Sequence, residues 1–124
     1  MFILTVEDSF SSAHQLMGYK GKCENLHGHN WKIAASVKGE RLDRIGILVD
    51  FHEIKKILKS IIGELDHKNL NDIPPFNETN PTSENIAKYI YEKFTDALGK
   101  NNENVKLESI TVWESETSKC TYFK

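Results

Sequence analysis

The sequence predicts an α+β fold, in which a four-stranded antiparallel sheet carries two helices on one face. Apolar and polar residues alternate near both ends of the chain, as in strands, whereas the middle has apolar residues at three- and four-residue steps, as in helices. The order is therefore strand, strand, helix, helix, strand, strand, with the helices inserted between two strand pairs. A chain of 124 residues can bury a hydrophobic core, and we expect residues 1–124 to form a single domain.

The first two strands are expected at residues 2–14 and 27–38, joined by a polar loop at residues 15–26. In the first strand the apolar alternate positions are Phe2, Leu4 and Val6. In the second strand they are Trp31, Ile33, Ala35 and Val37. Because side chains alternate across a strand, each of these sets lies on one face of the sheet.

The first helix is expected to follow Asp50, a plausible N-cap with Glu53 three residues later, and to end near Gly63. Its apolar stripe consists of Phe51, Ile54, Leu58, Ile61 and Leu65. After a loop at residues 66–80, a second helix is expected with Thr82 or Ser83 as its cap and Gly99 at its end. The stripe of that helix consists of Ile86, Ile90, Phe94 and Ala97.

The last two strands are expected at residues 105–114 and 118–123. A sheet of four strands leaves two edges whose backbone groups can pair with another chain. We therefore expect the protein to form oligomers through these edges.

The histidines form the most informative pattern in the chain. His27 and His29 are separated only by Gly28 and have the parity of the apolar face of the second strand, so their rings stand side by side. His14, at the end of the first strand, can complete a set of three nitrogen ligands with an open fourth position, which is typical of catalytic zinc. The alternative is that each histidine is an ordinary core or surface residue. Imidazole ligands suit zinc, copper, iron or nickel, and disfavour magnesium and calcium.

Composition excludes several classes of function. The net charge of −2 gives no electrostatic case for nucleic acid, and no segment has the apolar length of a membrane span. The opening residues lack the basic flank and cleavage site of a signal peptide. The two cysteines, Cys23 and Cys120, do not make a disulfide framework, so we expect a reduced, cytoplasmic protein.

Several motifs resemble those of the 6-pyruvoyl-tetrahydropterin synthase and 6-carboxy-tetrahydropterin synthase family. They are "FSSAH" at 10–14, "CENLHGHN" at 23–30, "VDF" at 49–51, "LDHKNLN" at 65–71, "PTSEN" at 81–85 and "VWE" at 112–114. The resemblance spans nearly the whole chain. It implies the tunnelling fold, a homohexamer built from two trimers, and active sites at subunit interfaces.

The same resemblance implies an enzyme that acts on 7,8-dihydroneopterin triphosphate. Zn²⁺ held by His14, His27 and His29 would act as a Lewis acid on the side-chain oxygens of this substrate. The thiolate of Cys23 would be the base, and Asp66 with His67, contributed by an adjacent subunit, would relay protons. Glu114 would anchor the pterin ring through two parallel hydrogen bonds.

Each of these residues also has a purely structural interpretation. Cys23 can be a buried thiol, as we expect for Cys120. Asp66 and His67 can be a loop aspartate beside a histidine at a helix C-terminus, and Glu114 can reach solvent at a strand end. His52 is expected at the surface. The triphosphate requires cationic groups, and the sequence does not choose among Lys22, Lys32, Lys119 and others.

The residues leave the product of the reaction open. The spacing of Cys23 before the paired histidines favours the branch that makes 6-carboxy-5,6,7,8-tetrahydropterin and acetaldehyde for queuosine and other deazapurines. Glu24 directly follows Cys23, which resembles a subgroup that also makes 6-hydroxymethyl-7,8-dihydropterin for folate, although Glu24 can equally be a polar loop residue. The pyruvoyl branch and a non-catalytic, zinc-stabilised pterin-binding module are the further alternatives.

Overall fold

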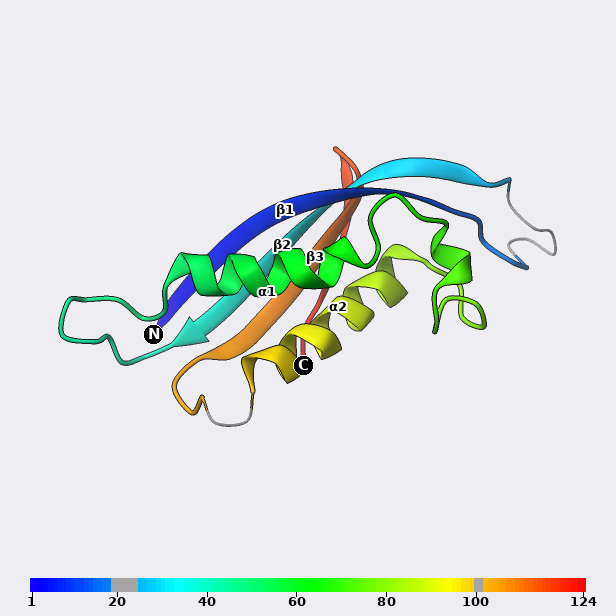
Figure 1. The fold of residues 1–124 in the computed structure, drawn as a ribbon. Coiled ribbons are helices and arrows are strands. Elements are labelled where there is room, and N and C mark those ends of the chain that lie inside the picture. Colours follow the sequence, from blue (N-terminus) through cyan, green and yellow to red (C-terminus); the bar gives the residue numbers. More distant parts are fainter. Residues whose placement is uncertain (19–24, 100–101) are drawn as a thin grey trace.

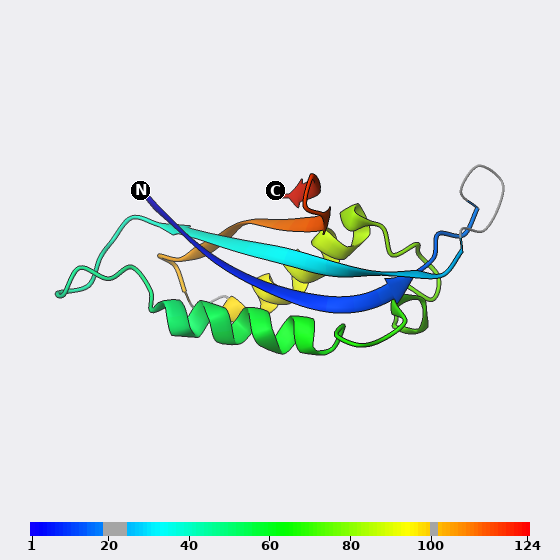
Figure 2. The same ribbon diagram turned by 90° about the horizontal axis from the view of Figure 1, so that it is seen from above.

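The computed structural model describes residues 1–18, 25–99 and 102–124. The elements are β1 (Phe2–His14), β2 (His27–Gly39), α1 (Phe51–Gly63), a short 3-10 helix η1 (Leu70–Asp72), α2 (Ser83–Leu98), β3 (Lys106–Ser115) and β4 (Ser118–Tyr122). The strands form one antiparallel sheet in the order β1-β2-β3-β4, and both helices lie on the same face of it (Figures 1 and 2). This arrangement confirms the fold class that the sequence predicts.

The long hairpin of β1 and β2 is the framework of the molecule. Its register is unbroken from the pair Phe2–Gly39 to the pair His14–His27. Strand β3 joins β2 only from Lys32 onward, so the end of β2 that carries the paired histidines extends past the β2–β3 ladder. As predicted, all the apolar residues of one parity in β2 are fully buried: Trp31, Ile33, Ala35 and Val37.

Helix α1 begins as the sequence predicts, because the Asp50 carboxylate accepts a hydrogen bond from the backbone N–H of His52. Ile54, Leu58, Ile61 and the additional residue Ile62 are buried against the sheet. The expectation for Phe51 is wrong: its side chain is 51% exposed, because it is the first residue of the helix and lies among surface residues. Leu65 is buried, but in the turn after the helix.

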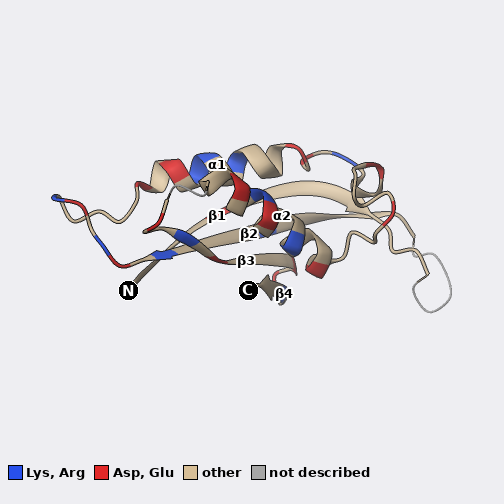
Figure 3. Ribbon diagram, turned by 90° about the horizontal axis from the view of Figure 1, so that it is seen from below, with Lys and Arg blue, Asp and Glu red and all other residues tan. Residues whose placement is uncertain are grey.

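Helix α2 is capped by Thr82, whose hydroxyl accepts a hydrogen bond from the backbone N–H of Asn85. Its core-facing residues include Ile86, Ile90 and Phe94, all fully buried. Ala97 is exposed, which corrects the predicted stripe. The four-residue spacing continues to Leu98, which packs against the core instead. Acidic and basic positions are interspersed along both helices (Figure 3).

Strand β3 contains two irregularities. The register with β2 shifts between Ser36 and Val37, and the register with β4 shifts between Trp113 and Ser115. Glu114 lies at the second shift, so it is the extra residue of a β-bulge. The bulge leaves Glu114 without a partner in the β3–β4 ladder, and Glu114 is one of the candidate site residues.

The chain after α1 covers one end of the free edge of β1. The backbone N–H of His67 donates to the carbonyl of Ser11, and the N–H of Ala13 donates to the carbonyl of Lys68. A parallel bridge between Ala13 and Asn69 continues this pairing. Residues 67–69 therefore lie beside the C-terminal end of β1. No helix in the described part of the chain is both long and apolar enough to cross a membrane.

Candidate metal centre

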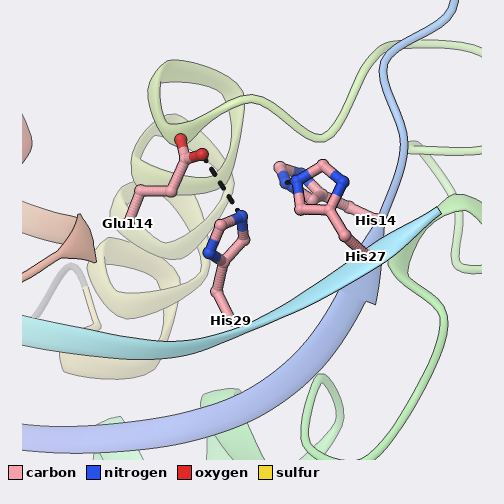
Figure 4. Close-up of side chains that lie close together, drawn as sticks. All are labelled: His14, His27, His29 and Glu114. Atoms are coloured by element: carbon pink, nitrogen blue, oxygen red, sulfur yellow. Dashed lines mark hydrogen bonds and ion pairs between the residues drawn. The ribbon is translucent and has the colours of Figure 1, made fainter. Parts of the chain in front are cut away.

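Three histidines converge at the end of the β1–β2 hairpin, together with Glu114 of β3 (Figure 4). One ligand atom from each of these four residues lies within 4.8 Å of the other three. The ring centroids of His14 and His27 are 4.7 Å apart, and those of His27 and His29 are 4.8 Å apart. The convergence follows from the register, which pairs His14 directly with His27, and from the shared parity of His27 and His29.

Main-chain carbonyls set the protonation of two of the rings. The Nδ1 atom of His14 lies 2.8 Å from the carbonyl oxygen of Pro81, and the Nδ1 atom of His27 lies 2.7 Å from that of Asn25. Because a carbonyl oxygen can only accept a hydrogen bond, both Nδ1 atoms carry the proton. In the neutral rings, the Nε2 atoms of His14 and His27 therefore present lone pairs.

These two lone pairs face each other, since the two Nε2 atoms are only 3.1 Å apart. Two acceptors at this distance repel unless a positive charge lies between them. Two nitrogens bound to one tetrahedral zinc ion at ~2.0–2.1 Å would themselves be about 3.3 Å apart. A ring that donates its Nδ1–H to a carbonyl and turns Nε2 to a metal is the usual arrangement of a metal-bound histidine. The site therefore fits a divalent metal ion that prefers nitrogen ligands.

Trp31 is fully buried and packs against two of the three histidines. The indole ring lies edge-on to the rings of His14 and His29, at centroid distances of 4.9 and 5.1 Å, and its Nε1–H donates to the carbonyl of Ser12. His14 itself is only 2% exposed. The buried indole thus limits the rotamers open to two of the three histidines.

Glu114 completes the group from β3. One carboxylate oxygen lies 3.3 Å from Nε2 of His29, and the other accepts a hydrogen bond from the hydroxyl of Ser83 at 3.2 Å. The sequence places Glu114 on the apolar face of its strand, and the structure adds that it lies beside the histidines. A carboxylate in this position can bind a metal ion directly or receive two N–H donors of a ligand next to it.

Asp66 and His67 form a separate pair. The Asp66 carboxylate accepts from the backbone N–H of Ser11 at 2.9 Å and from the ring of His67, also at 2.9 Å. The first of these hydrogen bonds, followed by the second, lowers the pKa of Asp66 below its usual value. His67 has a left-handed backbone, with φ of 56°, and its side chain is largely exposed. Both residues lie outside the group formed by the three histidines and Glu114.

The remaining candidate residues lie either outside the described part of the chain or away from the histidines. Cys23, Glu24 and Lys22 lie outside the described residues. Lys32 and Lys119 both contact the ring of Trp113, on the face of the sheet opposite to the histidines. These two lysines therefore lie away from the histidines of their own chain. His52 is exposed, as expected. Cys120 is only partly buried, which corrects the expectation of a buried thiol, although this burial still raises the pKa of the thiol.

Sequence reasoning missed the groups that surround the histidines. The carbonyls of Pro81 and Asn25 carry no side-chain signal, and their role depends on which backbone lies beside each ring. The sequence predicts Ser83 only as a possible helix cap, but its hydroxyl donates to Glu114. The "PTSEN" segment that contains Pro81 and Ser83 was the available signal, because it opens α2 next to the end of β1.

The fold is that of a known class of pterin enzymes. The chain belongs to the 6-pyruvoyl tetrahydropterin synthase family, whose model matches residues 3–124. It is 37% identical to a 6-carboxy-5,6,7,8-tetrahydropterin synthase of Synechocystis, over 99% of this chain and 94% of that protein. It is 38% identical to a dihydroneopterin monophosphate aldolase of Pyrococcus furiosus, over 86% of this chain and 83% of that protein. A solved structure of 6-pyruvoyl tetrahydropterin synthase from Caenorhabditis elegans superimposes with a TM-score of 0.83 at 33% identity, covering 100% of this chain and 97% of that one.

Proposed function

We propose that the protein is a zinc-dependent 6-carboxy-5,6,7,8-tetrahydropterin synthase that acts on 7,8-dihydroneopterin triphosphate in the cytoplasm. Its products would be 6-carboxytetrahydropterin, triphosphate and acetaldehyde, for queuosine and related deazapurines. The observation that carries this proposal is the convergence of His14, His27 and His29, two of them with Nδ1 bound to a carbonyl. The full-length similarity to a synthase of that name supports the choice of reaction.

The proposed roles follow the chemistry of each side chain. Bound zinc would supply a Lewis acid that polarises substrate oxygens and stabilises negative charge. The Cys23 thiolate would remove a proton from carbon, and His67 would exchange that proton while Asp66 holds its ring. Glu114, whose second oxygen is held by Ser83, would receive the ring N–H and amino group of the pterin.

The main alternative is carbon–carbon cleavage to 6-hydroxymethyl-7,8-dihydropterin, alone or beside the first activity. The similarity to a protein named dihydroneopterin monophosphate aldolase favours this alternative, as does Glu24 next to Cys23. Formation of 6-pyruvoyl-tetrahydropterin is supported by the C. elegans neighbour. A pterin-binding module without turnover is the non-enzymatic alternative.

Product analysis with 7,8-dihydroneopterin triphosphate distinguishes these functions. Acetaldehyde together with carboxypterin is the expected result, whereas hydroxymethylpterin would support the aldolase alternative. Cys23→Ala should abolish the carboxypterin product, and Glu24→Ala should abolish any hydroxymethylpterin. The loss of both products in either variant would contradict two separate bases. The absence of turnover in the zinc-loaded, reduced protein would contradict an enzyme.

We also propose that the active form is a homohexamer of two trimers, with each site shared between subunits. The edge strands β4 and β1, the latter outside the end that residues 67–69 cover, allow such pairing, and Asp66 and His67 lie outside the metal cluster of their own chain. Mixing inactive Cys23→Ala with inactive His67→Ala subunits should restore part of the activity, because some interfaces then combine an intact cysteine with an intact histidine. No recovery after proven subunit exchange would place both residues in one subunit.

A further inference from the structure

We propose that Asn80 is a positioning residue of the metal centre, which acts through the Pro81 carbonyl on the ring of His14. This inference rests on the proposed binding of zinc by His14. It goes beyond the ligands themselves, because Asn80 contacts neither the three histidines nor Glu114 through any bond described above. The evidence is a hydrogen-bonding pattern that occurs at both ends of the β1–β2 hairpin.

Three asparagine side chains each pair with the backbone of one residue beyond a strand end. Asn71 pairs with Gln15, Asn80 with Met17, and Asn104 with Arg41. In each case the amide oxygen accepts from the backbone N–H, and the amide nitrogen donates to the backbone carbonyl of the same residue, at 2.8–3.0 Å. A side-chain amide that makes both bonds replaces a neighbouring strand, so it fixes the path of the chain where the ladder ends.

Asn80 differs from Asn104 in what lies next to it. The following residue, Pro81, accepts the Nδ1–H of His14 at 2.8 Å. Two consecutive residues thus hold the chain around His14 at two points, the ring of His14 itself and the backbone of Met17 three residues later. Asn104 lies at the other end of the hairpin and holds Arg41, which is remote from the histidines.

Pro81 has little freedom to move independently of its neighbours. Its own φ angle is restricted by the proline ring. On one side Asn80 is bound to Met17, and the carbonyl of Asn80 accepts from the N–H of Thr82 and from the side chain of Asn85. On the other side Thr82 caps α2. The Pro81 carbonyl is therefore held in one direction.

That direction matters because it determines where Nε2 of His14 points. The hydrogen bond to Pro81 selects both the tautomer and the rotation of the ring, and partners of this kind tune metal affinity. Removing the Asn80 amide releases the two bonds that hold this residue to Met17 while leaving every proposed ligand in place. We therefore expect weaker metal binding without loss of a ligand.

The test compares Asn80→Ala with Asn104→Ala as a matched control, since both asparagines are half-buried and each forms the same pair of bonds. Zinc affinity is measured by competition with a chromophoric chelator on the metal-free proteins, and cobalt spectra report the ligand field. Both variants should lose similar thermal stability, but only Asn80→Ala should bind zinc about 10-fold more weakly. The NMR signal of the His14 Nδ1 proton should broaden or shift in that variant alone.

Equal zinc affinity in Asn80→Ala and Asn104→Ala would overturn the inference. If Asn80→Ala does not fold, Asn80→Asp serves instead, because it keeps the acceptor for the Met17 N–H and loses the donor; an affinity equal to that of the control would then overturn the inference. A wild-type protein that binds no zinc would overturn the proposed function together with this inference. Weakened binding confined to the Asn80 variants supports the inference whichever product the enzyme makes.

Discussion

His14 joins two parts of the chain that are far apart in sequence. Its Nδ1–H donates to the carbonyl of Pro81, and its Nε2 faces that of His27. The ring is buried, so it cannot exchange these partners for water without a local rearrangement. At the scale of single residues, the site thus depends as much on backbone carbonyls as on the histidines.

Glu114 has two candidate roles, as a metal ligand and as the anchor of the pterin ring, and one substitution separates them. Glu114→Gln keeps the size of the side chain and an acceptor for the Ser83 hydroxyl, but removes the charge and one of the two acceptors for a pterin. We expect an unchanged zinc stoichiometry and a KM for the pterin raised at least 10-fold, since hydrogen bonds to charged groups contribute about 1.5–3 kcal/mol. Metal analysis and steady-state kinetics give the answer. Loss of the bound zinc would instead identify Glu114 as a ligand.

Asp66 should make stability depend on pH in the acid range. Its pKa is lowered in the folded state by the N–H of Ser11 and by His67, so the ionised carboxylate stabilises the fold above the unfolded pKa of about 3.9. This contribution disappears as the pH falls through the folded pKa. We expect the difference in unfolding free energy between wild type and Asp66→Asn to shrink steadily below pH 5.

Urea unfolding at a series of pH values from 5 downward measures this difference. Asp72→Asn, at an exposed position of η1, is the control and should follow the wild type throughout the series. A difference between wild type and Asp66→Asn that does not change with pH would contradict the role given to the carboxylate.

Among the elements, α1 shows how far periodicity describes a helix. The stripe predicted from spacing includes both Phe51 and Leu58, but Leu58 is 1% exposed and Phe51 is 51% exposed. Leu58→Ala should lower the unfolding free energy by about 2–5 kcal/mol, because it opens a cavity in the core. Phe51→Ala should lower it by about 1 kcal/mol or less. Chemical denaturation of the two variants tests this, and equal losses would show that Phe51 is buried in solution.

Strand β3 combines regular alternation of side chains with a β-bulge at Glu114. Alternation predicts that Glu114 follows Ile110 and Val112 on the inner face, and the side chain does reach the histidines. The bulge at Glu114 ends the regular pairing with β4 at that point. Bulges are frequent next to functional sites, and this one leaves the residue that reaches the histidines without a partner in the ladder.

Across the whole molecule, the proposed zinc ion links two strands of the sheet. His14 lies on β1, whereas His27 and His29 lie on β2, so a bound ion ties the two strands together at the end of the hairpin where β1 leads into β2. At free zinc 100 times above Kd, binding adds about 2.7 kcal/mol to the folded state. Scanning calorimetry should therefore show a Tm lower by roughly 10 °C after chelation.

The histidine variants provide the control for this measurement. In His27→Ala one of the three proposed nitrogen ligands is lost and two remain. The Tm of this variant should therefore respond only weakly to zinc or to chelators. A wild-type Tm that is the same with zinc and after complete chelation would contradict a resident metal ion in the folded protein.

The local sequence patterns of this chain are sufficient to predict its helices and strands and part of the candidate site. Alternation in residues 2–14 and 27–38, and the three- and four-residue steps after Asp50 and Thr82, predict every long element to within two residues at each end. The spacing of His27 and His29 predicts that their rings share a face. These predictions succeed because they depend only on the periods of strands and helices.

The surroundings of those residues follow from tertiary packing and not from local patterns. Whether Pro81 lies beside His14, or Lys32 lies away from it, depends on how the helices pack on the sheet and on where β3 ends. The exposure of Phe51 and the bulge at Glu114 depend on the same packing. Periodicity along the chain therefore shows which side chains share a face. The protonation of the rings, the support from Asn80 and the partners of Glu114 depend on the packed backbone, because those contacts join residues that no local period relates.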